Sequence, residues 1–177
     1  MSLSSLNGLR VALACGMIAL AGCQVRPLYS DAAPNAAGIT ANAALNSISV
    51  NEVDSRVAQE VRNQLIFALS GGAGEPASPA YTLDLGVTSQ TLAAAAIQNA
   101  PGNAGQPTAG SVVLTSLYML KDASGKEVAT GKRTATASFD RPLQQFASLR
   151  AQRDAENRAA RELADMLKLA LAADLSK

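Results

Sequence analysis

Apolar and polar residues alternate cleanly along residues 81–88, and well enough along residues 48–53 to predict a first strand. Alternation is typical of a β-strand with one buried face. Residues 112–120 are apolar at both odd and even positions, as expected for a central strand of a sheet. Residues 128–139 are rich in Thr and Ala and predict a fourth strand, although their pattern does not identify its buried face.

Apolar residues recur every four positions between residues 55 and 69, which predicts a helix with one buried stripe. The stripe consists of Val57, Val61, Leu65 and Leu69. Asp54 or Ser55 is suited to cap the first turn of this helix, and Gly71-Gly72 is suited to end it.

A second and longer periodic stretch follows Pro142, whose missing N–H is harmless in a first helical turn. Apolar residues recur every four positions along this stretch, with alanines first and leucines later. They are Ala147, Ala151, Ala155, Ala159, Leu163, Leu167, Leu171 and Leu175. We therefore expect a long helix that starts at Pro142, approaches its neighbour closely along the alanines and fills a wider gap with the leucines.

The predicted element order is β-α-β-β-β-α, with residues 94–110 as a long hairpin loop between the second and third strands. An α+β fold satisfies this order. We expect a two-layer sandwich in which two helices pack on one face of a four-stranded, mostly antiparallel sheet.

The beginning of the chain carries a different kind of signal. Arg10 precedes a short apolar run, Val11–Leu20, which is followed by Ala21-Gly22-Cys23. This run is too short to span a bilayer, which takes about 20 apolar residues. A thiol placed directly after small residues is what lipid transfer and signal cleavage require. We predict that residues 1–22 are a lipoprotein signal peptide and that Cys23 carries acyl chains such as palmitate. The alternatives are an ordinary secretory signal, or a short buried helix with an incidental cysteine.

Residues 23–46 are mostly small and polar without a sustained period, and we interpret them as a lipidated tether. Residues 47–177 are then a single domain. The whole chain has 15 Lys and Arg against 14 Asp and Glu. Such a balance argues against binding of nucleic acid, which needs a basic surface.

The composition also argues against catalysis. The chain contains no His, which removes the commonest general base and the commonest metal ligand. A Ser–Lys pair could still form a hydrolase site, but no nucleophile motif adjoins Lys121, Lys126, Lys132 or Lys168. The sequence contains neither a Cys/His cluster nor a glycine-rich phosphate loop. We predict no enzyme activity, no metal and no cofactor.

Several short motifs, in order along the chain, resemble the LptE family of lipopolysaccharide-assembly lipoproteins in its alphaproteobacterial form. The matching segments are Gly22-Cys23, Arg26-Pro27-Leu28-Tyr29, Val61-Arg62-Asn63-Gln64-Leu65, Tyr81-Thr82-Leu83, Thr136-Ala137-Ser138-Phe139-Asp140 and Asp154-Ala155-Glu156-Asn157-Arg158-Ala159. Each motif is short, but together they cover nearly the whole chain.

The resemblance implies a fold of two helices on a four-stranded sheet. It further implies an outer-membrane lipoprotein, held on the periplasmic side by its lipid anchor. Such a protein plugs and partners the LptD β-barrel and binds lipopolysaccharide. A face of the sheet left bare by both helices is the natural docking surface for a barrel wall or a lipid.

Lipid A carries phosphates, so a site for lipopolysaccharide needs Arg or Lys close to apolar surface. The candidates are Lys132, Arg133 and Arg141. Lys132 and Arg133 are adjacent on a strand and should point to opposite faces of the sheet. An alternative interpretation is that these charges only deter aggregation at a sheet edge. An alternative for the whole chain is an adaptor lipoprotein of another transport complex, without a lipid ligand.

Overall fold

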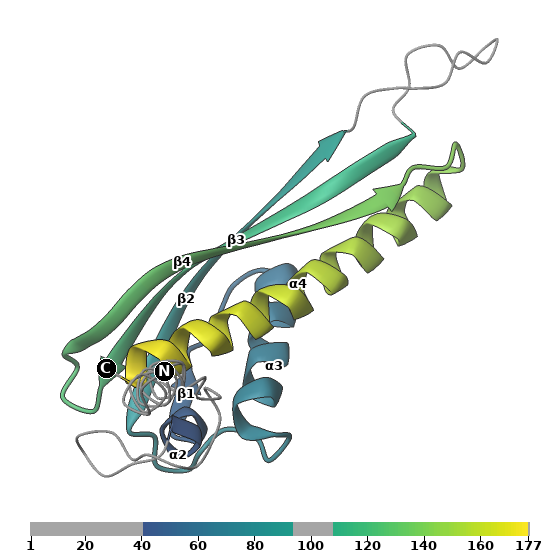
Figure 1. Ribbon diagram of the computed structural model, residues 1–177. Helices are drawn as coiled ribbons and strands as arrows, with labels where there is room; N and C mark the ends of the chain where they lie inside the picture. The colour runs from purple at the N-terminus through teal and green to yellow at the C-terminus, as the bar shows by residue number, and fades with distance from the viewer. Residues whose placement is uncertain (1–40, 94–107, 177) are drawn as a thin grey trace, which may run out of the picture. The chain divides into compact units, whose positions relative to one another are not determined.

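The computed structural model describes residues 41–93 and 108–176. The chain divides into two units, residues 1–30 and 31–177, and all described residues belong to the second. Its elements, shown in Figure 1, are α2 (Ala41–Asn46), β1 (Ile48–Val50), α3 (Arg56–Ser70), β2 (Tyr81–Ala93), β3 (Ala109–Asp122), β4 (Glu127–Asp140) and α4 (Gln145–Leu175). The α+β fold class and the predicted order of the four strands and two longer helices are confirmed.

The four strands form one sheet in the order β1-β2-β3-β4. Strand β1 lies parallel to the start of β2, and the other two pairs are antiparallel. Because β1 has three residues while β2, β3 and β4 have 13 or 14, most of the sheet has three strands. One edge of the sheet is formed by β1 and, beyond it, by the rest of β2. The other edge is formed by β4 along its whole length.

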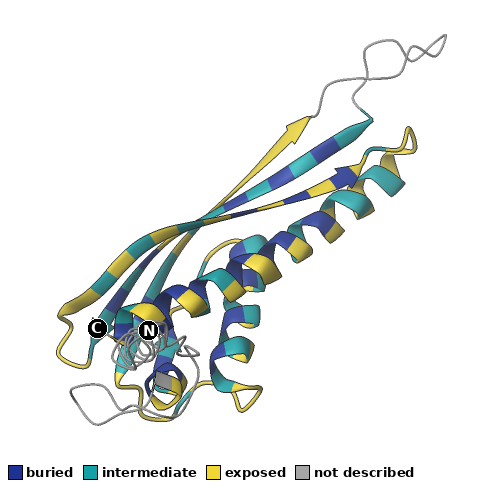
Figure 2. Cartoon of the chain, in the orientation of Figure 1, coloured by how far each residue is buried: buried dark blue, intermediate teal, exposed yellow. Residues whose placement is uncertain are grey.

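One face of the sheet is covered by α3 and α4, and the core lies beneath them (Figures 1 and 2). Leu83 of β2 and the even-numbered residues of β3 from Val112 to Leu120 point to this covered face. The odd-numbered residues of β3 from Ser111 to Lys121 point to the other side, which no described element covers. We call that side the open face.

Strand β4 buries its odd-numbered residues toward its C-terminal end. Ala135, Ala137 and Phe139 are buried beneath α4, whereas the residues between them are exposed. Further back on the same face lies Gly131, where a Cβ atom would come within 2.6 Å of the Tyr118 hydroxyl. Two alanines and a glycine on the buried face explain why hydropathy alone does not identify it.

Helix α3 forms as its pattern predicts. Ser55 caps it, since its side chain accepts a hydrogen bond from the Ala58 N–H at 3.1 Å. Gly71 ends it in the left-handed conformation at φ 61°, which glycine adopts without steric cost. The buried stripe includes Val61, Leu65 and Leu69.

Helix α4 spans 31 residues and buries the expected alanine and leucine stripe from Ala155 to Leu175. Its start differs from the prediction, because the helix begins at Gln145 rather than at Pro142. Gln144 is extended, with ψ 113°, and its side chain makes no capping hydrogen bond. Pro142 therefore lies in the connection from β4, and the first helical residue comes three positions later.

The predicted tether was too long at its C-terminal end. Residues 41–46 form helix α2, and Ala44 and Leu45 are buried in the core. A six-residue helix of small residues has too little periodicity to be visible in a sequence, and packing against α3 and α4 stabilises it. Residues 1–40, with the predicted signal peptide and Cys23, lie outside the described residues, as does most of the predicted 94–110 loop. Within the described residues, no helix is long and apolar enough to cross a bilayer.

Candidate functional site

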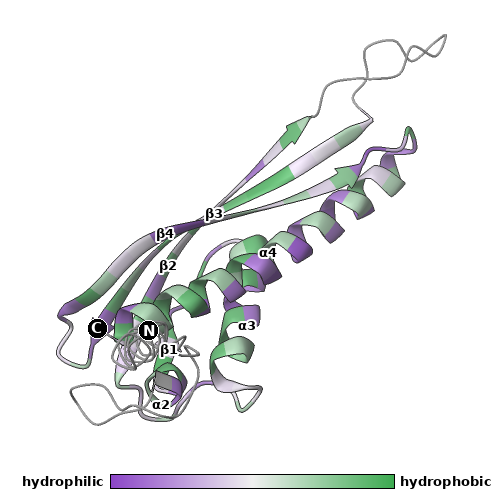
Figure 3. Ribbon diagram, viewed as in Figure 1, coloured by the Kyte–Doolittle hydropathy of each residue, from purple (hydrophilic) through white to green (hydrophobic). Residues whose placement is uncertain are grey.

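The open face carries a shallow hollow of about 720 Å³ on its central strand. Gly86 of β2, Leu117 of β3 and Lys132 of β4 form one cross-strand row through it. Leu117 is 60% exposed, although it lies in the middle strand. Figure 3 shows the largely hydrophobic character of β3 between the more polar β2 and β4. The hollow therefore combines an apolar floor with an ammonium group at one side.

An ion pair forms another side of the hollow. The Lys121 ammonium bonds Asp84 at 2.7 Å, and the Asn51 amide also donates to Asp84, at 2.5 Å. The bond from Lys121, followed by that from Asn51, holds the pKa of Asp84 below its ordinary value. Both charged side chains are more than a third exposed, so this pair contributes little to stability. The ion pair instead holds the Lys121 side chain against Asp84 on the neighbouring strand.

Lys132 and Arg133 point to opposite faces, as the alternation predicts. Lys132 lies on the open face, and no described carboxylate lies within 4 Å of its ammonium group. Arg133 lies on the covered face, where its guanidinium is 6.0 Å from the centroid of the Tyr118 ring. It also donates to the Lys132 carbonyl at 2.7 Å. Arg133 is thus held by intramolecular contacts, whereas Lys132 is available at the surface.

Arg141 lies directly after β4, and its backbone N–H donates to the Thr108 carbonyl at 2.7 Å. Asp140 lies eight positions after Lys132 along the extended strand, a span of about 27 Å. The structure therefore does not bring the three candidate cations together into one phosphate site.

A surface that the sequence analysis missed adjoins Arg141 at the start of α4. Its apolar members are Leu143, Phe146 and Leu149, which are 69%, 74% and 52% exposed. Arg150 and Arg153 are also exposed. We call the set formed by Arg141, Leu143, Phe146, Leu149, Arg150 and Arg153 the helix-start patch.

A signal for the helix-start patch was present in the sequence. Phe146, Leu149, Arg150 and Arg153 have the i, i+3, i+4, i+7 spacing that places residues on one helix face. The alanine stripe is the stronger pattern in α4, and it identifies the face that packs on the sheet. The shorter pattern of the helix-start patch is therefore easily missed. Within the described residues, no carboxylate lies within 4 Å of Arg141, Arg150 or Arg153.

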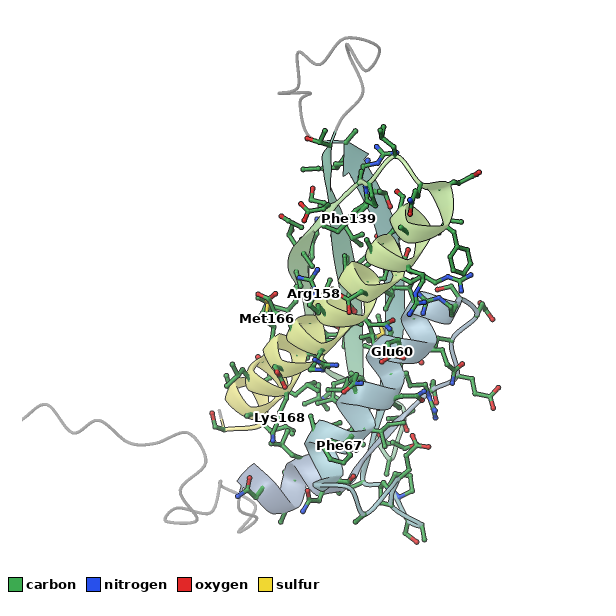
Figure 4. All side chains as sticks on the ribbon, turned by 90° about the vertical axis from the view of Figure 1, so that its right-hand side faces the viewer. Glu60, Phe67, Phe139, Arg158, Met166 and Lys168 are labelled. Atoms are coloured by element: carbon green, nitrogen blue, oxygen red, sulfur yellow. The ribbon has the colours of Figure 1, made fainter. Side chains whose placement is uncertain are left out.

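Further along α4, Arg158 has a structural role. It donates to Asp154 at 2.9 Å and to the Ser138 carbonyl at 2.8 Å, and Figure 4 shows it near Phe139 of β4. It therefore ties the helix to the edge strand. Within the described residues, no group of three or more acidic or cysteine side chains is placed to hold a metal ion.

Comparison with known families decides the relationship. The model of the family described as LptE, lipopolysaccharide-assembly, matches residues 45–171, which is more than half of the chain. The chain belongs to the LptE family. The resemblance inferred from the short motifs is thereby confirmed, and the family is one of non-enzymatic lipoproteins of lipopolysaccharide assembly.

Solved structures of lipoproteins share the fold. A predicted lipoprotein from Caulobacter crescentus CB15 is 28% identical, with a TM-score of 0.62 over 76% of this chain and 95% of that one. A minor lipoprotein from Acinetobacter baumannii is 17% identical, with a TM-score of 0.52 over 72% and 90% of the two chains. Rare lipoprotein B from Shewanella oneidensis is 13% identical, with a TM-score of 0.52 over 71% and 92%. The last two show the fold alone. A comparison with curated protein sequences found no match.

Proposed function

We propose that this LptE-family chain is an outer-membrane lipoprotein that plugs and partners the LptD β-barrel and binds lipopolysaccharide during its assembly at the cell surface. The family match over residues 45–171 carries this proposal. Cys23 holds the chain on the periplasmic side of the outer membrane through its acyl chains. A lipidated cysteine of this kind carries about three chains, and two hydrophobic signals are enough for stable anchoring.

The helix-start patch is the surface best suited to lipopolysaccharide. A phosphorylated acylated sugar needs cations for its phosphates and apolar side chains for its acyl chains. Arg141 and Arg150 supply cations, and Leu143 and Phe146 supply exposed apolar surface. Of the three cations predicted from the sequence, Arg141 therefore has the most favourable surroundings for lipid binding. Arg133, beneath the sheet beside Tyr118, has the least.

The open face is the surface best suited to the barrel partner. It carries several exposed threonines and the charged groups around the hollow, with Leu117 and Met119 in its centre, and no described element covers it. A sheet face of this kind is complementary to another extended protein surface such as a barrel wall. Lys132 is then a contact to the partner, and it also remains a second candidate for a lipid phosphate.

The first experiment is purification of the full lipidated chain from detergent-solubilised outer membranes, through a tag at its C-terminus. We expect the LptD barrel and lipopolysaccharide to co-purify with it in stoichiometric amounts. Recovery of a different transport complex without lipopolysaccharide would contradict the proposal and would support the adaptor alternative.

The second experiment assigns the lipid surface. Lipopolysaccharide binding of the purified chain is compared with that of the Arg141→Glu and Arg150→Glu variants. We expect each charge reversal to weaken binding at least tenfold, because it replaces attraction to phosphate with repulsion. Arg161→Glu is the matched control, since Arg161 is an exposed arginine on α4 about 16 Å along the helix from Arg150. Equal losses in all three variants would indicate a general charge effect and would exclude the helix-start patch as the site.

A further inference from the structure

Three glycines interrupt the long strands of the sheet, and two of them have an evident structural reason. At Gly110 a Cβ atom would come within 2.8 Å of the Phe139 ring. At Gly131 it would come within 2.6 Å of the Tyr118 hydroxyl. In both places an aromatic ring of the neighbouring strand lies across the glycine on the covered face. A side chain at either position would displace that ring.

Gly86 has no such reason within the described part of the chain. A Cβ atom there would have one neighbour within 4 Å, the Leu117 carbonyl oxygen, at an ordinary contact distance of 3.9 Å. Its φ angle is also not positive, so its backbone conformation is open to any residue. A glycine inside a strand weakens the strand and often marks a place where a ligand or another chain approaches closely.

The space over Gly86 is the hollow of the open face. Leu117 lies next to it in the cross-strand row, and Lys132 follows. The Lys121 ammonium at the side is already bonded to Asp84, whereas the Lys132 ammonium has no described carboxylate within 4 Å. The hollow therefore offers the bare backbone of Gly86, the apolar side chains of Leu117 and Met119, and one available positive charge.

A comparable arrangement occurs on the covered face, where a glycine and a cation are accompanied by an aromatic ring. There Gly131 is the floor, the Tyr118 ring lies across it, and the Arg133 guanidinium is 6.0 Å from the ring centroid. Such a cation is attracted to the face of an aromatic ring. The hollow on the open face has the glycine and the cation, and it lacks the ring.

We propose that the hollow over Gly86 receives an aromatic side chain of the barrel partner, with a neighbouring carboxylate of that partner bonded to Lys132. This inference rests on the proposed function, because it names the contact by which the barrel recognises the open face. Aromatic residues that fill pockets at the centre of an interface supply much of its binding energy. Lys132 is the lysine available to the partner, because the neighbouring Lys121 is already paired with Asp84. A carboxylate is the protein group that pairs with such an ammonium.

A variant that fills the hollow tests the inference. In the full lipidated chain, Gly86→Trp supplies a ring of its own to the floor that the partner's ring would occupy. We expect the affinity for purified LptD barrel, measured by titration in detergent, to fall at least tenfold. The unfolding temperature should stay equal or rise, because a ring over a strand glycine covers exposed backbone. The affinity of Gly86→Ala for the barrel should be intermediate between those of wild type and Gly86→Trp.

Two further variants separate this contact from general effects. Thr136→Trp adds the same bulk to the open face, but on β4 and outside the hollow, and should keep barrel affinity within about threefold of wild type. Lys132→Glu leaves the hollow open but repels a carboxylate, and it should weaken barrel binding at least tenfold. If Gly86→Trp failed to fold, the Lys132→Glu variant would still decide the question.

The outcomes distinguish this inference from the proposed function. Absence of barrel binding by the wild-type chain would overturn both. Wild-type barrel binding that survives both Gly86→Trp and Lys132→Glu would overturn the inference alone. A selective loss of binding to lipopolysaccharide micelles in these variants would assign the hollow to a lipid instead. A loss of self-association, measured by sedimentation equilibrium, would assign it to a second copy of the chain.

Discussion

Arg62 and Glu75 close the free edge of β1. The N–H and carbonyl of Val50 both point away from β2, toward the edge of the sheet. The N–H donates to Glu75 at 2.9 Å, and the carbonyl accepts two hydrogen bonds from Arg62, at 2.8 and 3.0 Å. Arg62 and Glu75 are also bonded to each other, at 3.0 Å. This cluster blocks an edge that could otherwise pair with another strand.

We expect Arg62→Ala to lower the free energy of unfolding by about 2 kcal/mol, because it removes both hydrogen bonds to the Val50 carbonyl and leaves the Glu75 carboxylate with the Val50 N–H but without the guanidinium. Arg62→Lys should recover part of this loss, since an ammonium cannot donate to both groups in the same geometry. Urea denaturation of the two variants provides the measurement. Arg161→Ala, at an exposed position of α4, should stay within about 0.5 kcal/mol of wild type. Equal stability of wild type and Arg62→Ala would show that water replaces the guanidinium at no cost.

Some residues of the candidate site follow from the sequence and others do not. Alternation along a strand is enough to predict that Lys132 and Arg133 face opposite sides. Which of the two sides is open depends on where the helices pack. The row that joins Gly86, Leu117 and Lys132 depends on the pairing register of three strands, and one sequence does not contain that register.

At the scale of elements, the C-terminal half of α4 is tied to the sheet by a partly buried hydrogen bond. The Tyr118 hydroxyl of β3 donates to the Asp174 carboxylate of α4 at 2.8 Å, and Tyr118 is 4% exposed. Burial raises the pKa of Tyr118, and the hydrogen bond to Asp174 and the charge of Asp174 raise it further. The phenol is therefore held neutral where the helix ends.

This contact predicts a pH dependence of stability. In the unfolded chain Tyr118 loses its proton near its ordinary pKa of about 10, whereas in the folded chain it stays protonated to higher pH. Its contribution is complete below about pH 10 and is lost as the pH rises through the raised pKa. We expect Tyr118→Phe to cost about 1 kcal/mol at pH 8, and the difference from wild type to shrink as the pH rises above about 10. Urea unfolding of both proteins across this range is the test, and a constant difference would contradict the assignment.

Elements with strong local patterns were predictable, and those that depend on tertiary contacts were not. Helix α3 follows from its stripe, its Ser55 cap and its Gly71 end, all of which are local features. Helix α2 does not, because six residues of small side chains become helical only where Ala44 and Leu45 are buried by other elements. The start of α4 was misplaced because Pro142 fits a first helical turn but does not require one.

At the scale of the molecule, the helix-start patch and the hollow over Gly86 lie on different parts of the domain. The patch is at the start of α4, and the hollow is on the open face, about 27 Å back along β4. Two-helix coverage of one sheet face was predictable from the element order, and it is this coverage that leaves the second face available. The surface proposed for lipid and the surface proposed for the partner can therefore be exposed at the same time.

This separation predicts that the two contacts are independent. We expect Arg141→Glu to lower affinity for lipopolysaccharide and to leave barrel affinity within about twofold of wild type, while Gly86→Trp has the opposite effect. Sites this far apart without shared partners contribute additively, so the double variant should show each single loss at its full size. Titrating all four proteins with each ligand gives the coupling directly. A double variant whose barrel affinity falls by more than about threefold beyond the Gly86→Trp value would show that lipid and barrel engage one continuous surface.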